Sequence, residues 1–140
     1  MILFDTDTVT YFFHGDKNVC RKVDKVGDEV LAITLITRYE MLRGRADNLL
    51  KAADKVELRK AVDRFRRTEQ EISRFEVVGF DEYAIEKFEK LRIEKKLKKM
   101  GRADMLIACI ALANNALLVT RNTRDFENVV GLRMENWVDE

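Results

Sequence analysis

The chain has 140 residues, of which 46% are hydrophobic and 36% carry a charged side chain, and its formal net charge is +1. This length and composition predict one soluble globular domain, residues 1–140, with a substantial hydrophobic core. The near-neutral charge provides no overall basic field for nucleic acid, and no apolar run approaches the roughly 20 residues of a membrane-spanning helix.

Residue types also narrow the possible cofactors. The two cysteines, Cys20 and Cys109, form no CxxC pattern, so neither a disulfide framework nor a zinc site is indicated. The single histidine, His14, excludes a metal cluster built from several histidines of one chain. The apolar start is interrupted at Asp5 and is too short for a secretory signal. We therefore expect a cytoplasmic protein.

The first half of the chain alternates short strands with helices. In chain order, its apolar spacing and capping residues predict a strand at 1–5, helices at 7–13 and 16–26, a strand at 29–33, and helices at 34–44 and 46–74. Thr34 is the N-cap candidate for the helix that carries Glu40, and Gly44 is its predicted end.

The second half continues the alternation. It predicts a strand at 75–79, a helix from Asp81 to about Met100, a helix at 103–114, a strand at 116–120 and an edge strand at 132–135. The helix at 103–114 is apolar almost all round, which predicts a central position. Together the pattern predicts an α/β fold in three layers, α/β/α, with a central, mostly parallel sheet of four to five strands.

Four polar positions lie where apolar segments end or turn: Asp5, Glu40, Asp104 and the cluster Asn122–Asp125. Ligand sites of parallel sheets lie outside the carboxyl ends of the strands, so we expect these positions to share one crevice. Crowded carboxylates repel one another, and a divalent cation such as Mg²⁺ relieves that repulsion and also binds phosphate oxygens. The pattern therefore predicts metal-dependent hydrolysis of a phosphodiester.

Three of the acids also have a purely structural explanation. Asp5 is placed to cap the next helix, Asp104 to interact with a helix dipole, and Asp125 to cap a turn. Glu40 is harder to explain in this way, because a carboxylate buried without a partner is costly. The joint occurrence of these acids favours a site.

Basic residues accompany the acids. The segment Arg92–Arg102 holds six basic residues and one acid, a local net charge of +5, and leads directly into Asp104. Such a run is either a solvated helix face or a phosphate-binding edge. Arg43, Arg121 and Arg124 flank the acids more closely and are candidates for binding phosphates near a scissile bond.

The motifs taken in order resemble a PIN domain, most closely the VapC type of toxin–antitoxin systems. The resemblance spans nearly the whole chain and rests on five segments, at residues 2–7, 33–44, 102–108, 118–126 and 131–137. It implies a PIN-like fold and an endoribonuclease that depends on Mg²⁺ or Mn²⁺. Asp5, Glu40 and Asp104 match the three core acids of the family, and Asp5 and Asp104 are the implied metal ligands.

The fourth acidic position differs from many members of the family. Many carry an acid where this chain has Asn122, and many VapC-like members carry one at the position of Asp125, which is therefore the expected fourth catalytic acid. Asp7 stands where the family usually has asparagine, and we expect it to join the metal site or to bond the helix backbone. Supporting polar roles are expected for four side chains, those of Thr6, Asp7, Thr120 and Asn122.

The resemblance also implies partners. These are an RNA substrate, a cognate VapB-like antitoxin and a second copy of the chain in a homodimer. Two alternatives remain open: an inactive binding module with a PIN fold, and a phosphatase of the haloacid dehalogenase type, whose first motif resembles residues 3–9. The sequence does not indicate which RNA is cleaved, nor whether one or two metal ions bind.

Overall fold

The computed structural model of the protein describes residues 1–139. Within this range, five parallel strands form one sheet in the order β3-β2-β1-β4-β5. The strands are β1 (Ile2–Phe4), β2 (Leu31–Thr34), β3 (Glu76–Val78), β4 (Leu117–Val119) and β5 (Arg133–Glu135). The predicted α/β fold with a central parallel sheet is confirmed.

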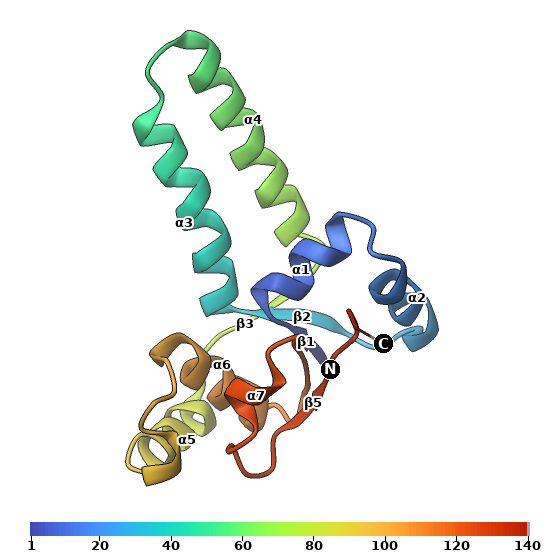
Figure 1. The fold of residues 1–140 in the computed structure, drawn as a ribbon, viewed down its shortest axis with the longest axis vertical. Coiled ribbons are helices and arrows are strands. Elements are labelled where there is room, and N and C mark those ends of the chain that lie inside the picture. Colours follow the sequence, from blue (N-terminus) through green and yellow to red (C-terminus); the bar gives the residue numbers. More distant parts are fainter. Residues whose placement is uncertain (140) are drawn as a thin grey trace.

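Helices connect the strands and flank the sheet (Figure 1). They are α1 (Thr6–Phe13), α2 (Lys17–Val26), α3 (Leu35–Lys51), α4 (Lys55–Ile72), α5 (Glu82–Leu91), the 3₁₀ turn η1 (Lys95–Leu97), α6 (Arg102–Ala113) and α7 (Thr123–Phe126). The α3 and α4 helices form a long hairpin that projects from the body of the molecule (Figure 1). Within residues 1–139, no helix combines the length and apolar character that crossing a membrane requires.

Side-chain caps explain where most of the long helices begin. A side-chain oxygen accepts a hydrogen bond from a backbone N–H of the first helical turn at Asp5, Asp16, Thr34, Asp54 and Asp81. These bonds satisfy N–H groups that have no partner inside the helix. Asp5 directly follows β1 and Thr34 is the last residue of β2, so the sheet edge and the helix starts coincide there.

Both faces of the sheet are covered by apolar side chains. Along β1, Ile2 and Phe4 point into a core with α1, α2 and the indole of Trp137, whereas Leu3 points into a second core with α5 and α6. This alternation follows from the two-residue period of a strand. The apolar α6 lies within the second core, as its composition predicts.

The prediction that a helix ends at Gly44 is wrong. The α3 helix continues through Gly44 to Lys51, and the next helix starts after a turn at residues 52–54 rather than at 46. A glycine inside a helix costs about 1 kcal/mol relative to alanine. Packing of α3 and α4 against each other outweighs this, because burying one large apolar side chain contributes roughly 1.5–3 kcal/mol.

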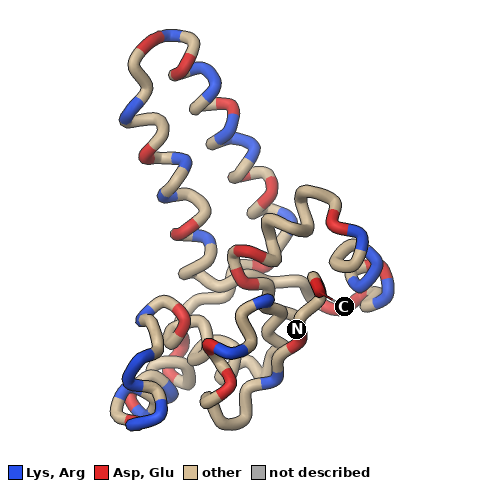
Figure 2. The backbone as a smooth tube through the Cα atoms, viewed as in Figure 1, with Lys and Arg blue, Asp and Glu red and all other residues tan. Residues whose placement is uncertain are grey.

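The predicted single helix from Asp81 to Met100 is also wrong. The α5 helix ends at Leu91, and the chain then forms η1 before α6 starts at Arg102. Figure 2 shows the basic residues gathered along this stretch of backbone. Like charges three or four residues apart destabilise a helix by roughly 0.2–0.5 kcal/mol per pair, and several such pairs coincide here. Burial of Leu97 fixes the shorter turn to the core.

Substitution of Leu118 by alanine should show how much the sheet core contributes. Leu118 is 0% exposed on β4, so Leu118→Ala should lower the free energy of unfolding by about 2–5 kcal/mol. Leu50→Ala is the matched control because Leu50 is 87% exposed on α3, and its effect should stay within about 0.5 kcal/mol. Urea denaturation followed by circular dichroism measures both. Equal effects of the two substitutions would contradict this description of the core.

Candidate functional site

The register of the sheet places three polar residues side by side. Phe4 pairs with Ile33 on one side and with Val119 on the other. The residue after Phe4 is Asp5, which therefore lies between Thr34 and Thr120 at the carboxyl edge of the sheet. All three of these side chains are buried.

Hydrogen bonds hold the carboxyl group of Asp5 in one orientation. Its Oδ1 accepts from the backbone N–H of Thr8 at 2.9 Å, and its Oδ2 accepts from the Thr120 hydroxyl at 2.6 Å. The hydroxyl of Thr8 in turn donates to the backbone carbonyl of Val119 at 3.0 Å. Asp5 is therefore a helix cap, as its position in the sequence suggested, and its second carboxylate oxygen is also fixed by Thr120.

Glu40 reaches the same edge from α3. The Thr34 side chain caps this helix by accepting from the backbone N–H of Thr37 at 3.1 Å. Glu40 lies in the second turn, is exposed, and accepts a hydrogen bond from the Thr6 hydroxyl at its Oε1 over 2.9 Å. Thr6 follows Asp5 directly, so the two acids are linked through neighbouring residues of α1.

The pKa of Asp104 shows that the predicted acids share one electrostatic environment. Asp104 lies in the first turn of α6 and is partly buried. Its pKa is raised above the ordinary value, first by burial and then by the negative charges of Asp125, Glu40 and Asp5. Like charges raise a carboxyl pKa only when they are close enough to repel it. The other three predicted acids thus lie near enough to Asp104 to repel its charge.

Asp125 comes from a short helix that the sequence analysis did not predict. The α7 helix places Asp125 in its first turn, exposed to solvent. Asn122 precedes this helix, and its backbone N–H donates to the Thr120 hydroxyl at 3.0 Å, whereas its side chain forms no capping bond. The link from Asn122 to Asp5 therefore runs through Thr120 rather than through the asparagine side chain.

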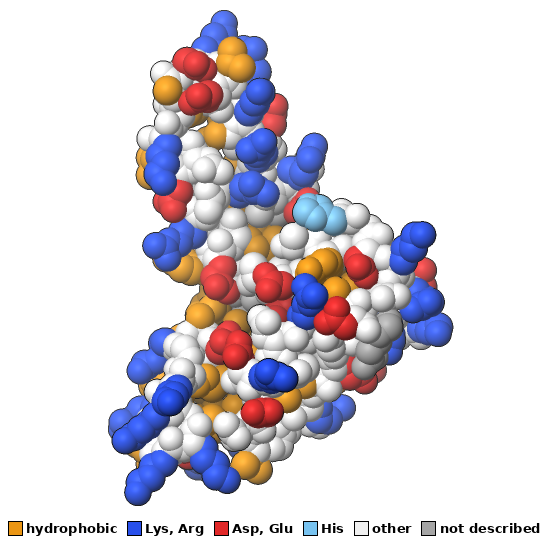
Figure 3. Space-filling model, in the orientation of Figure 1, with side chains coloured by type: hydrophobic (Ala, Val, Ile, Leu, Met, Phe, Trp, Pro, Cys, Tyr) orange, Lys and Arg blue, Asp and Glu red, His pale blue; other side chains and the backbone are white. Residues whose placement is uncertain are grey.

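The acidic side chains lie on an open face of the molecule. Figure 3 shows acidic side chains grouped at the waist between the α3–α4 hairpin and the lower body. Asp7 is exposed in the first turn of α1, and no hydrogen bond or ion pair of its side chain is found within residues 1–139. A cavity of about 520 Å³ lies between α1, α3 and α4. Its lining includes Thr6 but none of the four acids. We therefore centre the site on the carboxylates.

The four acids offer the oxygen ligands that hard divalent cations prefer. The repulsion at Asp104 would be relieved by a positive charge. Within residues 1–139, no three Asp, Glu, His or Cys side chains converge tightly enough to enclose a metal ion.

The three candidate arginines differ in what they contact. Arg121 donates from its Nε to Asp139 at 3.1 Å and from a terminal nitrogen to the Tyr11 hydroxyl at 2.8 Å. Arg43 lies over the ring of Tyr39, with 5.9 Å between the guanidinium carbon and the ring centroid. Arg124 lines a pocket together with Asp104 and Asp125. Their role in binding phosphate stays a prediction.

The sequence analysis missed Thr8 and Tyr11. Thr8 supplies the N–H that binds Asp5, and Tyr11 joins α1 to Arg121. The capping pattern could have identified Thr8, because the carboxylate of an N-cap residue accepts a hydrogen bond from the backbone N–H two or three positions later. Tyr11 carried no such signal, because its partner lies 110 positions away.

Replacement of Asp104 by asparagine should reveal the repulsion as a dependence of stability on pH. Because the folded-state pKa of Asp104 is raised, its ionised form destabilises the folded chain at neutral pH, and this penalty disappears as falling pH protonates the carboxyl in both states. With chelator present, Asp104→Asn should raise the melting temperature at pH 7.

This gain should shrink toward acidic pH, as differential scanning fluorimetry would show. Asp63→Asn is the control, because Asp63 is exposed on α4. A gain that stays constant from pH 7 to pH 4 would rule out a raised pKa at Asp104.

Comparison with known proteins places these features in a family. Residues 2–132 match the sequence model of the PIN domain. Ribonuclease VapC2 from Rickettsia felis is 38% identical over 68 residues, which are 47% of this chain and 51% of that protein, so the match spans about half of that relative. The tRNA(fMet)-specific endonuclease VapC from Salmonella typhimurium is 28% identical over 137 residues, or 96% of each chain.

The structure also resembles solved proteins over its whole length. The structure of VapBC-1 from nontypeable Haemophilus influenzae superposes with a TM-score of 0.78 at 25% identity, covering 98% of each chain. The family match and the parallel sheet agree with the resemblance of the sequence motifs. The chain belongs to the PIN domain family.

Proposed function

We propose that this protein is a metal-dependent endoribonuclease of the VapC type, the toxin of a toxin–antitoxin pair. The observation that carries the proposal is the shared electrostatic environment of Asp5, Glu40, Asp104 and Asp125 at the carboxyl edge of a parallel sheet. The relatives named above as ribonuclease and endonuclease support the same activity. The reaction is hydrolysis of an RNA phosphodiester by water.

Asp5 and Asp104 are the proposed ligands of Mg²⁺ or Mn²⁺, and Glu40 and Asp125 complete the catalytic acids. When bound, the cation lowers the pKa of a water and offsets the negative charge that develops on the phosphoryl group. The chain prepares this position in advance, because Thr8 and Thr120 fix the Asp5 carboxylate before any ligand arrives. Such preorganisation avoids reorganisation during the reaction.

Glu40 is the proposed acceptor of the proton from the attacking water. Thr6 occupies its Oε1, which orients the carboxylate and leaves Oε2 as the accepting atom. Thr120 receives the N–H of Asn122 while it donates to Asp5, so Asn122 supports the site through its backbone. Asp7 is assigned a supporting role at the entrance, since its side chain is exposed beside Thr6.

The proposed partners follow from the same comparison. A cognate VapB-like antitoxin is expected because the solved neighbour is named VapBC-1. The relatives named ribonuclease and tRNA(fMet)-specific endonuclease support an RNA substrate, and we also propose a cytoplasmic location. A homodimer is proposed as well. An apolar groove of about 300 Å³ along α3 and α4 supports it, because the groove leaves Leu35 and Tyr39 exposed without a covering element among the described residues.

Two alternatives are less well supported. An inactive binding module has no need of four acids, yet all four lie in one electrostatic environment here. A phosphatase of the haloacid dehalogenase type would use Asp5 as nucleophile and Asp7 as acid, and would leave Glu40 without a role. The hydrogen bond between Thr6 and Glu40 beside Asp5 favours the nuclease.

Asp5→Asn should abolish cleavage of RNA. The purified protein, freed of any antitoxin, is incubated with Mg²⁺ or Mn²⁺ and a labelled single-stranded RNA or a labelled tRNA. The variant should cleave at least about 100-fold more slowly, since each 1.4 kcal/mol of lost transition-state stabilisation slows a reaction about tenfold. EDTA should stop the wild-type reaction to the same extent.

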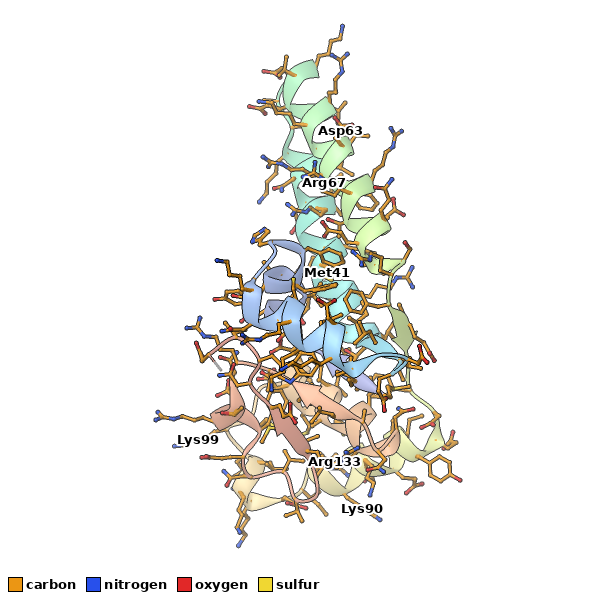
Figure 4. All side chains as sticks on the ribbon, turned by 90° about the vertical axis from the view of Figure 1, so that its right-hand side faces the viewer. Met41, Asp63, Arg67, Lys90, Lys99 and Arg133 are labelled. Carbon is orange, nitrogen blue, oxygen red and sulfur yellow. The ribbon has the colours of Figure 1, made fainter. Side chains whose placement is uncertain are left out.

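Asp63→Asn is the matched control, because Asp63 lies on the projecting hairpin, away from the sheet (Figure 4). It should cleave at the wild-type rate. Circular dichroism should show that both variants are folded. Cleavage that survives Asp5→Asn in a folded protein would exclude the proposed metal site. Absence of cleavage together with absence of metal binding would support the inactive module.

A further inference from the structure

We propose that a pocket between η1 and α7 binds a backbone phosphate of the RNA next to the scissile bond. The inference rests on the proposed ribonuclease function and adds a substrate-binding site to it. The pocket has a volume of about 310 Å³ and is lined by Asp104 and Asp125 on the side of the catalytic acids. Its other polar lining side chains include Lys96, Lys99 and Arg124. Cations and catalytic acids therefore share one cavity.

The pocket includes two of the four lysines of this segment. Lys96 lies in η1 and Lys99 lies in the turn that follows it, whereas neither Lys95 nor Lys98 lines the pocket. Leu97 is buried and fixes the turn to the core. Figure 4 shows Lys99 on the lower body, away from the hairpin.

The three cations of the pocket are free to bind an anion. Within residues 1–139, the side chains of Lys96, Lys99 and Arg124 form no ion pair and no hydrogen bond. Two other basic residues of the same run are already engaged. Arg92 pairs with Glu89, and Arg102 lies over the ring of Phe88, with 5.0 Å between the guanidinium carbon and the ring centroid.

The charges of the pocket fit a phosphate of the proposed substrate. Asp104 and Asp125 repel an anion unless positive charge offsets them, and Lys96, Lys99 and Arg124 supply that charge, the first two from the segment at η1 and the third from the position beside Asp125 on α7. Lysine and arginine contacts to phosphates position a nucleic acid without reading its bases. A phosphate held here therefore lies beside the acids of the same pocket.

The solvated-face explanation of the basic run accounts for only part of it. Lys95 and Lys98 are exposed and line no part of this pocket, as a solvated face requires. Lys96 and Lys99 are also exposed, but they border a cavity that contains two of the catalytic acids. Within the basic run, only Lys96 and Lys99 are therefore assigned to binding RNA.

The test is the affinity of the full-length protein for a fluorescent single-stranded RNA, measured in EDTA with Asp5→Asn as background, so that no cleavage occurs. Adding Lys96→Ala and Lys99→Ala should weaken binding on the order of tenfold. The slope of log K against log salt concentration should fall in magnitude by about 1.4, because each contact to a single-stranded phosphate contributes about 0.7.

The matched control removes the same charge elsewhere. Lys17 and Lys25 are exposed on α2, on the opposite side of the molecule from η1 (Figure 1). Lys17→Ala with Lys25→Ala should leave both the affinity and the salt slope within about twofold of the background. Replacing Lys96 and Lys99 by arginine keeps the charge and should preserve binding. Circular dichroism confirms that each variant is folded.

Equal affinities of the pocket variant and the control would overturn the proposal. If the wild-type protein then still cleaves RNA in a manner that depends on Asp5, the ribonuclease proposal stands without this pocket. If no protein cleaves RNA but binding depends on Lys96 and Lys99 alone, the pocket stands as a phosphate site and the ribonuclease proposal fails. The two proposals are therefore tested separately.

Discussion

The carboxyl group of Asp5 joins three elements at one edge of the sheet. It ends β1, caps α1 through the N–H of Thr8, and receives the hydroxyl of Thr120 from the end of β4. Hydrogen bonds to a charged group contribute about 1.5–3 kcal/mol each, so this carboxylate stabilises the arrangement that contains it. The same bonds keep a negative charge in a buried position. The rest of the site depends on that fixed charge.

Asp104, which also belongs to the site, has a charge that the fold does not stabilise. Asp104 carries a raised pKa because burial and three neighbouring carboxylates disfavour its charge. A protein optimised only for stability would not retain such an arrangement, and strained electrostatics of this kind concentrate at functional sites. Lys96, Lys99 and Arg124 line a pocket with Asp104 and Asp125, and within residues 1–139 none of the three forms an ion pair with these acids. Both groups are therefore available, the basic side chains to a ligand that carries phosphate and the acids to a cation.

The sequence predicted where the strands lie along the chain better than where the helices end. Apolar runs and caps located all five strands and the start of α3 at Thr34, because those signals are local. The end of α3 was wrongly predicted at Gly44 because packing between α3 and α4 outweighs the low helix propensity of one glycine. The acids were predicted from positions where apolar segments end or turn. The bond from Thr120 to Asp5 depends instead on the pairing of β1 with β4, across 115 positions. The pocket at η1 depends on a helix break that charge repulsion and the burial of Leu97 produce together.

The most direct test of the central claim is to locate the cation. Crystals grown with Mn²⁺ would show it as a peak in an anomalous difference map. The account predicts one peak in contact with Asp5 and Asp104, with Glu40 and Asp125 within reach through water. A map without a peak at saturating Mn²⁺, or with a peak away from all four carboxylates, would contradict the assignment of this edge of the sheet as the metal centre.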